Sequence, residues 1–183
     1  MTTDFRATWL QDMQERFQSL KDMGDRAIAQ ITDGEFFHQL DGESNSVAVL
    51  LQHMGGNLRS RWTDFLTTDG EKPDRNRDGE FVIAPGTRRS DVVARWEEGW
   101  RCVFDAFPAL RPEDVEKMVR VRGEPHSVPQ AIHRQVTHAA YHVGQIVFLV
   151  KHYRSSEWKT LSIPRDGTEV FNRALAAKYA PKT

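Results

Sequence analysis

Cysteine is almost absent from this sequence of 183 residues. The single thiol, Cys102, excludes an internal disulfide and a metal site built from several thiolates. Cys102 lies in the apolar run Trp100-Arg101-Cys102-Val103-Phe104. A packed, unreactive thiol is expected there, because reactive cysteines need surroundings that favour the thiolate. Any metal ligands must therefore be sought among other residue types.

The sequence also lacks a surplus of either charge and lacks a long apolar run. Twenty-five basic and 26 acidic residues leave a net charge of -1, whereas nucleic-acid binding usually needs a basic surplus. No apolar run approaches the roughly 20 residues that span a bilayer. The first residues, Met-Thr-Thr-Asp-Phe-Arg, show no basic-then-apolar signal pattern. We therefore predict a cytoplasmic protein that binds neither nucleic acid nor membrane.

Apolar residues recur at three- and four-residue steps in four segments, which predicts four long helices. The first covers about 4–31, with an apolar stripe from Phe5 to Leu20. The second starts at Asn45 or Ser46 and reaches about residue 66. The third is capped by Ser90 and ends before Pro112. The fourth, about 128–153, opens with a capping box of Ser127 and Gln130 and with a proline in its first turn.

The segment 67–89 between the second and third helices is rich in Asp, Gly, Pro and Arg, and it is long for a compact domain. A crossover of this length lets the two helices run parallel. The sequence therefore predicts an all-α fold, a four-helix bundle of up-down-down-up topology. We expect a single domain with its core at about 4–155 and an appendage at about 156–183. A short helix near 168–179 is expected to bury Val170, Phe171 and Leu175.

Three histidines form the pattern that suggests chemistry. His138 and His142 are one helical turn apart, so both imidazoles can reach one ion from the same face of a helix. His53 lies beside the apolar positions Leu50 and Met54, which points it toward the interior of the bundle. Spacing alone also fits ordinary buried histidines that are hydrogen-bonded and bind no metal.

Polar residues continue the faces that carry these histidines. Asn57 follows His53, and Gln135 and Gln145 flank the pair in the last long helix. Because unpaired buried polar groups are costly, we predict that these three side chains orient the imidazoles or a bound water. The other four histidines are predicted to be surface or structural residues: His38 and His126 in loops or caps, His133 on another face, and His152 too far along its helix.

The arrangement resembles the DinB-like, or YfiT-like, superfamily of bacterial metal-binding four-helix bundles. The similarity rests on His53 in Leu50-Leu51-Gln52-His53-Met54, on the pair His138 and His142 followed by Val143-Gly144-Gln145-Ile146, and on the long loop. The stretch 53–62, with Gly70-Glu71-Lys72-Pro73 and Arg75-Asn76-Arg77 after it, is similar to an uncharacterised branch. The resemblance covers about residues 5–155.

This resemblance implies one divalent ion, held by His53, His138 and His142, with positions left open for water or ligand. Zinc and nickel are the expected ions, followed by iron, since imidazole binds all three. Characterised relatives include transferases and isomerases that use a low-molecular-weight thiol such as bacillithiol or mycothiol. The partners expected here are accordingly a small-molecule thiol and an electrophile.

Thiol transfer and hydrolysis make different demands on the residues near the ion. Hydrolysis usually needs a nearby carboxylate as base, and the histidine faces offer none within one turn, although the third helix or the 67–89 loop can supply one. A metal ion lowers the pKa of a thiol without a separate base. The sequence thus favours a metal-dependent thiol transferase. In the loop, Arg75, Arg77, Arg88 and Arg89 either recognise a carboxylated thiol or form a solvated surface.

Two other roles remain open at this point. The chain can be a non-catalytic, stress-associated protein that binds a metal or a ligand, or it can be a metal-dependent hydrolase. Five tryptophans exceed what one core usually needs, so one or two are candidates for a homodimer interface. They are Trp9, Trp62, Trp96, Trp100 and Trp158.

Overall fold

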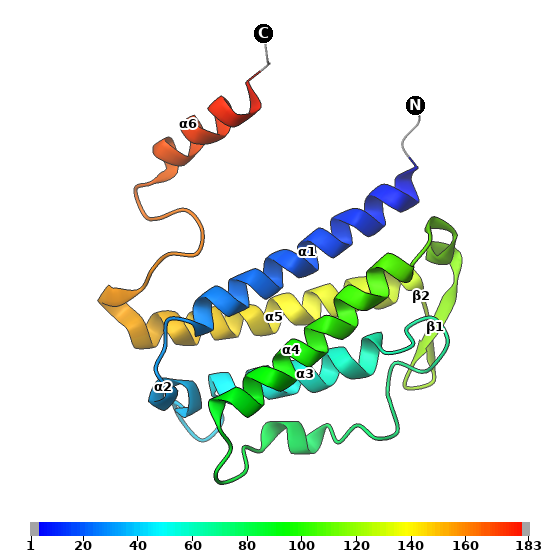
Figure 1. Cartoon of the computed structure of the whole chain (residues 1–183), viewed down its shortest axis with the longest axis horizontal. Coiled ribbons are helices and arrows are strands. Elements are labelled where there is room, and N and C mark those ends of the chain that lie inside the picture. Colours follow the sequence, from blue (N-terminus) through cyan, green and yellow to red (C-terminus); the bar gives the residue numbers. More distant parts are fainter. Residues whose placement is uncertain (1–3, 181–183) are drawn as a thin grey trace.

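The computed structural model describes residues 4–180, and most of them are helical (Figure 1). Within that range the α-helices are α1 (Phe5–Ile28), α2 (Asp33–Phe37), α3 (Val47–Trp62), α4 (Arg89–Ala106), α5 (Val128–Arg154) and α6 (Thr168–Tyr179). Short 3-10 turns are η1 (Asp78–Phe81), η2 (Phe107–Ala109), η3 (Pro112–Glu116) and η4 (Ser155–Glu157). The strands β1 (Met118–Val121) and β2 (Glu124–Ser127) pair antiparallel in one hairpin.

Four long helices make the bundle, and the prediction of an all-α fold is confirmed. Helix α1 packs along α5, and α3 packs against both α4 and α5. Figure 1 shows α3 and α4 running in the same direction, with segment 63–88 returning the chain between them. The topology is therefore up-down-down-up, as the long crossover predicted. None of the helices within residues 4–180 combines the length and the apolar character that a membrane crossing requires.

The helix starts follow local capping chemistry. Ser127 and Gln130 form the predicted capping box at the start of α5, with hydrogen bonds of 3.3 and 2.8 Å. Ser46 caps α3 through its hydroxyl. The prediction of Ser90 as the cap of α4 was wrong. That helix begins two residues earlier, because the Asp91 carboxylate accepts the Arg88 backbone N–H at 3.1 Å and makes Arg88 the cap.

Two helices end earlier than apolar periodicity predicted. Helix α3 stops at Trp62 instead of residue 66, and Asp64 then adopts a left-handed backbone with φ of 49°. A left-handed residue just past a helix closes it, whatever apolar residues follow. Helix α1 ends at Ile28, and the separate helix α2 begins after Thr32, which forms a capping box with Glu35. This Thr-x-x-Glu pattern was readable in the sequence and was missed.

The core is aromatic at its centre. Phe17, Trp62, Trp96 and Trp100 are buried, and the Trp96 indole N–H donates to Asp25 at 2.9 Å. Trp9 and Trp158 are partly buried against the same core. Packing within one chain thus accounts for all five tryptophans, and the predicted homodimer gains no support from them. The predicted stripe of α1 was wrong at its first member, since Phe5 is 78% exposed.

Two glycines bring α3 and α4 into close contact. A Cβ atom at Gly55 would lie 2.5 Å from the Arg95 carbonyl oxygen, and one at Gly99 would lie 2.6 Å from the Gly55 carbonyl oxygen. Only residues without a side chain allow backbones to approach so closely. This contact fixes α3, the helix that carries His53, against its parallel neighbour.

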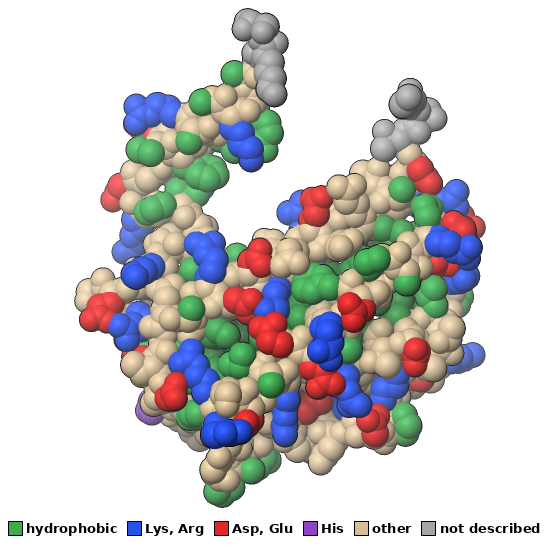
Figure 2. Space-filling view, viewed as in Figure 1, with side chains coloured by type: hydrophobic (Ala, Val, Ile, Leu, Met, Phe, Trp, Pro, Cys, Tyr) green, Lys and Arg blue, Asp and Glu red, His purple; other side chains and the backbone are tan. Residues whose placement is uncertain are grey.

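Helix α6 has the predicted bounds but not the predicted burial. Val170, Phe171 and Leu175 are exposed, because α6 stands away from the bundle (Figures 1 and 2). The chain before it is tied to α1 by Arg26, which donates to the Leu161 carbonyl, and by Gln30, which bonds the backbone of Lys159. The amphipathic pattern of α6 specified a helix, but no other element within residues 4–180 covers its apolar side.

Candidate metal centre

Helices α3 and α5 bring the three predicted histidines together. One nitrogen from each of His53, His138 and His142 lies within 4.8 Å of the other two. The Nε2 atoms of His53 and His138 are 3.4 Å apart, and the ring centroids of His138 and His142 are 4.6 Å apart. Such convergence of three imidazoles, with His53 lying 85 residues before His138 in the chain, is the arrangement that a divalent ion requires.

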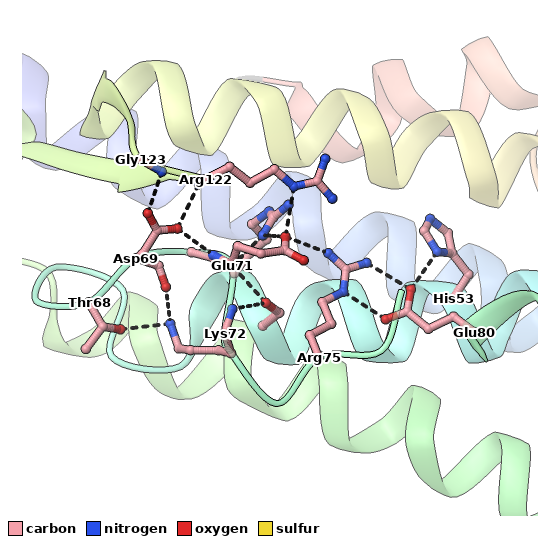
Figure 3. A network of polar contacts seen from close by, with 12 residues as sticks. His53, Thr68, Asp69, Glu71, Lys72, Arg75, Glu80, Arg122 and Gly123 are labelled. Atoms are coloured by element: carbon pink, nitrogen blue, oxygen red, sulfur yellow. Dashed lines mark hydrogen bonds and ion pairs between the residues drawn. The ribbon is translucent and has the colours of Figure 1, made fainter. Parts of the chain in front are cut away.

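Glu80 orients the first of these ligands. Its Oε2 atom lies 2.9 Å from Nδ1 of His53, and both groups are buried (Figure 3). Because an ionised carboxylate can only accept, Nδ1 of His53 donates to Glu80, and Nε2 is directed toward His138, 3.4 Å away. Arg75 holds the same carboxylate from the other side, with Nε 2.8 Å from Oε1 and Nη2 2.8 Å from Oε2.

Sequence reasoning left Glu80 unidentified. It lies in η1 within the long loop, at no helical spacing from any histidine, and the loop holds several other acidic residues. Gln52 fixes this segment to α3 by donating to the carbonyls of Gly79, Glu80 and Val82. Gly56 leaves the room that the carboxylate occupies, since a Cβ atom there would lie 2.3 Å from Oε1 of Glu80. These contacts depend on the fold and leave no spacing signal in the chain.

The three residues predicted to orient the imidazoles, Asn57, Gln135 and Gln145, differ in their contacts with the histidines. Gln145 Oε1 is 2.8 Å from Nδ1 of His142, a contact that holds the orientation of that ring. Asn57 and Gln135 line the same cavity but make no hydrogen bond to a histidine among the described residues. Nδ1 of His138 is buried and likewise lacks a partner within residues 4–180. His138 is therefore the least constrained of the three rings.

The surroundings favour the neutral form of His138 and His142 and the ionised form of Glu80. Burial, with the nearby His142 and His53, lowers the pKa of His138 to about 3. Burial also lowers the pKa of His142, against the opposing hydrogen bond of Gln145. Burial opposes ionisation of Glu80, but its hydrogen bonds to His53 and Arg75 hold its pKa below the usual value. A neutral imidazole is the form that binds a metal, and His138 and His142 are held in that form.

This electrostatic setting gives the metal-free protein a specific pH dependence. The folded-state pKa of His138 is about 3 and its ordinary value is 6.5, so between these values the unfolded chain binds a proton that the folded chain excludes. Stability should therefore fall as the pH drops below 6.5, by about 1–2 kcal/mol at pH 5 from this group. Urea unfolding at pH 7.5 and pH 5.0 measures it. The His138→Gln variant should lose about 1–2 kcal/mol less stability than the native protein when the pH falls from 7.5 to 5.0. The same pH dependence in both proteins would contradict the assignment to His138.

The residues present fit a metal ion. The Nε2 atoms of His53 and His142 are free for coordination because Glu80 and Gln145 engage the opposite nitrogens. The carboxylate–histidine contact is the usual outer support of a metal ligand. Three imidazoles and no thiolate suit zinc, nickel or iron without separating them. The described residues can thus hold one divalent ion, and their chemistry leaves its identity open.

A cavity of about 340 Å³ opens beside the histidines. Arg75 and Arg77 of the long loop line it, as the hypothesis of ligand recognition by this loop requires. Arg88 and Arg89 do not. Arg88 pairs with Asp91 on the surface, and Arg89 donates to the Ile28 and Ile31 carbonyls at the end of α1.

The remaining histidines lie outside the cluster. His38 is exposed and contacts Tyr153, His133 packs edge-on against Trp9, and His152 is exposed. The position predicted for His126 was wrong, because it lies in β2 and is buried, not in a loop or cap. Its Nδ1 bonds the Glu124 carbonyl at 3.1 Å, so its role is structural.

Comparison with known proteins identifies a family for this chain but assigns it no activity. The sequence model of a family described as "Protein of unknown function (DUF1572)" matches residues 4–167. That match covers the bundle, the long loop and all three histidines, and it ends just before α6. A search of curated proteins gives no significant match.

Proposed function

The chain belongs to the DUF1572 family, and from the geometry of its histidine cavity we propose that it is a metal-dependent transferase acting with a low-molecular-weight thiol. His53, His138 and His142 would hold one divalent ion, with zinc or nickel expected first and iron next. The cavity of about 340 Å³ would admit the thiol. The predicted resemblance to DinB-like bundles, which include thiol-dependent transferases, agrees with this proposal.

The observation that carries the proposal is the absence of an available carboxylate. No Asp or Glu is among the described residues that line the cavity. The long loop does supply Glu80, as the sequence left open, but both of its oxygens are engaged by Arg75 and one by His53 as well. A group held in this way orients a ligand and is not free to take a proton from water. This favours thiol transfer over hydrolysis.

The transfer step needs little from the protein beyond position and charge. When bound, the ion supplies a Lewis acid that stabilises a thiolate at neutral pH. The thiol proton leaves to solvent, the sulfur forms a bond to an electrophilic carbon, and the bond from that carbon to its leaving group breaks. His53 and His142, oriented by Glu80 and Gln145, would help to fix the position of the sulfur, and the arginines would favour its anionic form.

A second hollow adjoins the first through Tyr141, which lines both. Its volume is about 740 Å³, and the exposed Leu40 and Phe148 contribute apolar surface to it, beside polar residues that include Asp41 and Glu43. An apolar electrophile would be accommodated here, beside the cavity that would receive the thiol. Ligand sites commonly combine apolar walls with a few placed polar groups in this way.

Thiol-dependent conjugation tests the proposal. Protein loaded with zinc or nickel would be mixed with cysteine, glutathione, bacillithiol or mycothiol in turn, with 1-chloro-2,4-dinitrobenzene as the electrophile. Release of chloride and formation of the thioether would be followed against metal-free protein and His138→Ala. We expect a rate above both controls with at least one thiol.

If no thiol gave a rate above the controls while the protein retained its metal, the proposed transferase activity would be overturned. The site would then belong to a non-catalytic protein that binds a metal or a ligand, which is the alternative drawn from the sequence.

A further inference from the structure

Arginine dominates the lining of the histidine cavity. Five guanidinium groups contribute to it, and within the described residues no acidic side chain does. They are Arg61, Arg75, Arg77, Arg122 and Arg134. The chain as a whole is nearly neutral, with 25 basic and 26 acidic residues, so this concentration of positive charge is local.

Three of these arginines already have partners behind the cavity wall. Arg61, Arg75 and Arg122 all contact Glu71, at 2.7, 3.2 and 3.2 Å. Arg75 also binds Glu80, and Figure 3 shows Arg75 and Arg122 around these two carboxylates. Two carboxylates thus form ion pairs with three guanidinium groups. The three guanidinium groups carry one positive charge more than these two carboxylates, and all three line the cavity together with the histidines.

The other two arginines lack a strong partner among residues 4–180. Within this range Arg77 forms an ion pair only with Asp78, at 3.5 Å, and the side chain of Asp78 is 97% exposed. Exposed pairs of this kind are weak. Arg77 also lies over the Phe81 ring that packs against His53. Arg134, one turn before His138 on α5, makes no side-chain hydrogen bond or ion pair within residues 4–180. Both can therefore bind an anion without first giving up a buried contact.

The cavity also holds two acceptors without donors. The side-chain oxygens Oδ1 of Asn57 and Oε1 of Gln135 are buried and have no hydrogen-bond partner among the described residues. Both residues line the cavity beside the histidines. Buried carbonyl oxygens are normally paired. A ligand that carries N–H or O–H groups would supply the missing donors.

We propose that this cavity binds a small anionic molecule that carries both oxyanion groups, recognised by Arg77 and Arg134, and N–H or O–H donors, recognised by Asn57 and Gln135. The inference deepens the proposed function and rests on it only in naming the thiol, which would be an acidic one with amide or hydroxyl groups. A cavity of about 340 Å³ suits a metabolite and excludes a folded polymer. The oxyanion can be a carboxylate or a phosphate, since guanidinium binds both in the same way.

Calorimetric titration with simple probes separates these features. N-acetylaspartate carries two carboxylates and an amide N–H, succinate keeps the charge without the N–H, and N-acetylasparagine amide keeps the N–H without the charge. Inorganic phosphate distinguishes the two oxyanions. Each probe would be titrated into zinc-loaded and metal-free protein. We expect N-acetylaspartate or phosphate to bind, succinate to bind more weakly than N-acetylaspartate, and the neutral amide not to bind.

Matched variants assign the binding to the two arginines. Arg77→Gln and Arg134→Gln should each weaken binding about 10-fold, because each removes a charge-assisted hydrogen bond. Arg88→Gln removes the same charge from the surface of the same loop and should leave affinity unchanged. Asn57→Leu should abolish the advantage of N-acetylaspartate over succinate.

Equal affinity of Arg134→Gln and Arg88→Gln for the anion would overturn the inference, and so would tight binding of N-acetylasparagine amide. The inference would also be overturned if neither N-acetylaspartate nor phosphate bound at millimolar concentration. Its failure is distinguishable from that of the proposed function, because metal content and thiol conjugation are measured on the same samples. Anion binding without thiol-dependent turnover would contradict only the proposed transferase activity.

Discussion

Replacing His138 with alanine should abolish metal retention. The three histidine nitrogens lie within 4.8 Å of one another, and two ligands alone hold a divalent ion weakly. Loss of an outer contact typically costs 10–100-fold in metal affinity, so loss of a ligand should cost more than about 100-fold. Elemental analysis of untagged protein, purified without a nickel resin, measures the result. About one ion per chain is expected in the native protein and little in the variant.

His133→Ala is the matched control. It removes an imidazole from the same helix, but His133 packs against Trp9 and lies outside the cluster. His53→Ala and His142→Ala should behave like His138→Ala. If His133→Ala lost the metal as His138→Ala does, or if the native protein held no ion after soaking with zinc and nickel, the three histidines would be ordinary buried polar residues.

Gly56→Ala should weaken metal binding although it touches no histidine. The added methyl group would meet Oε1 of Glu80 at 2.3 Å and Cδ at 2.8 Å. The carboxylate cannot move away freely, because Arg75 holds both oxygens and His53 holds one. Displacing it removes the group that orients His53. A loss of about 10–100-fold in zinc affinity is expected, as for other outer contacts of metal ligands, and calorimetric titration measures it.

Gly144→Ala provides a control of the same chemical change. Gly144 lies in α5 between His142 and Gln145, and nothing lies within 4 Å of a Cβ atom built there. Alanine is the better helix former by about 1 kcal/mol, so this variant should be at least as stable as the native protein and should bind zinc normally. Glu80→Gln tests the carboxylate itself. Native zinc affinity in Gly56→Ala would mean that Glu80 does not govern the orientation of His53.

The two sets of variants test different parts of the proposed site. The histidine variants test which side chains hold the ion, whereas the Gly56→Ala variant tests whether the long loop contributes to metal binding. Segment 63–88 contributes Arg75 and Arg77 to the cavity and Glu80 to the contact with His53, so it is more than a connection between α3 and α4. A loop of this length in a compact domain commonly has such a role.

Local signals in the sequence determined the helices and the histidine pair. Apolar periodicity located four long helices, and Ser127 with Gln130 marked the start of α5 to the residue, because capping depends on atoms only a few positions apart. The spacing of His138 and His142 places both rings on one helix face in any fold that keeps α5 intact. The long crossover also implied parallel neighbours, and with them the bundle topology.

Tertiary structure decided what depends on contacts between distant segments. The meeting of His53 with the α5 pair needed helix packing, and so did the exposure of Phe5 and of the apolar side of α6. Glu80 and Arg75 reach His53 from an irregular loop, where no periodicity relates sequence position to direction. A helix carries its geometry in its own hydrogen bonds, whereas a loop takes its path from the surface it packs on. The sequence therefore predicted the candidate ligands, and only the fold revealed what orients them.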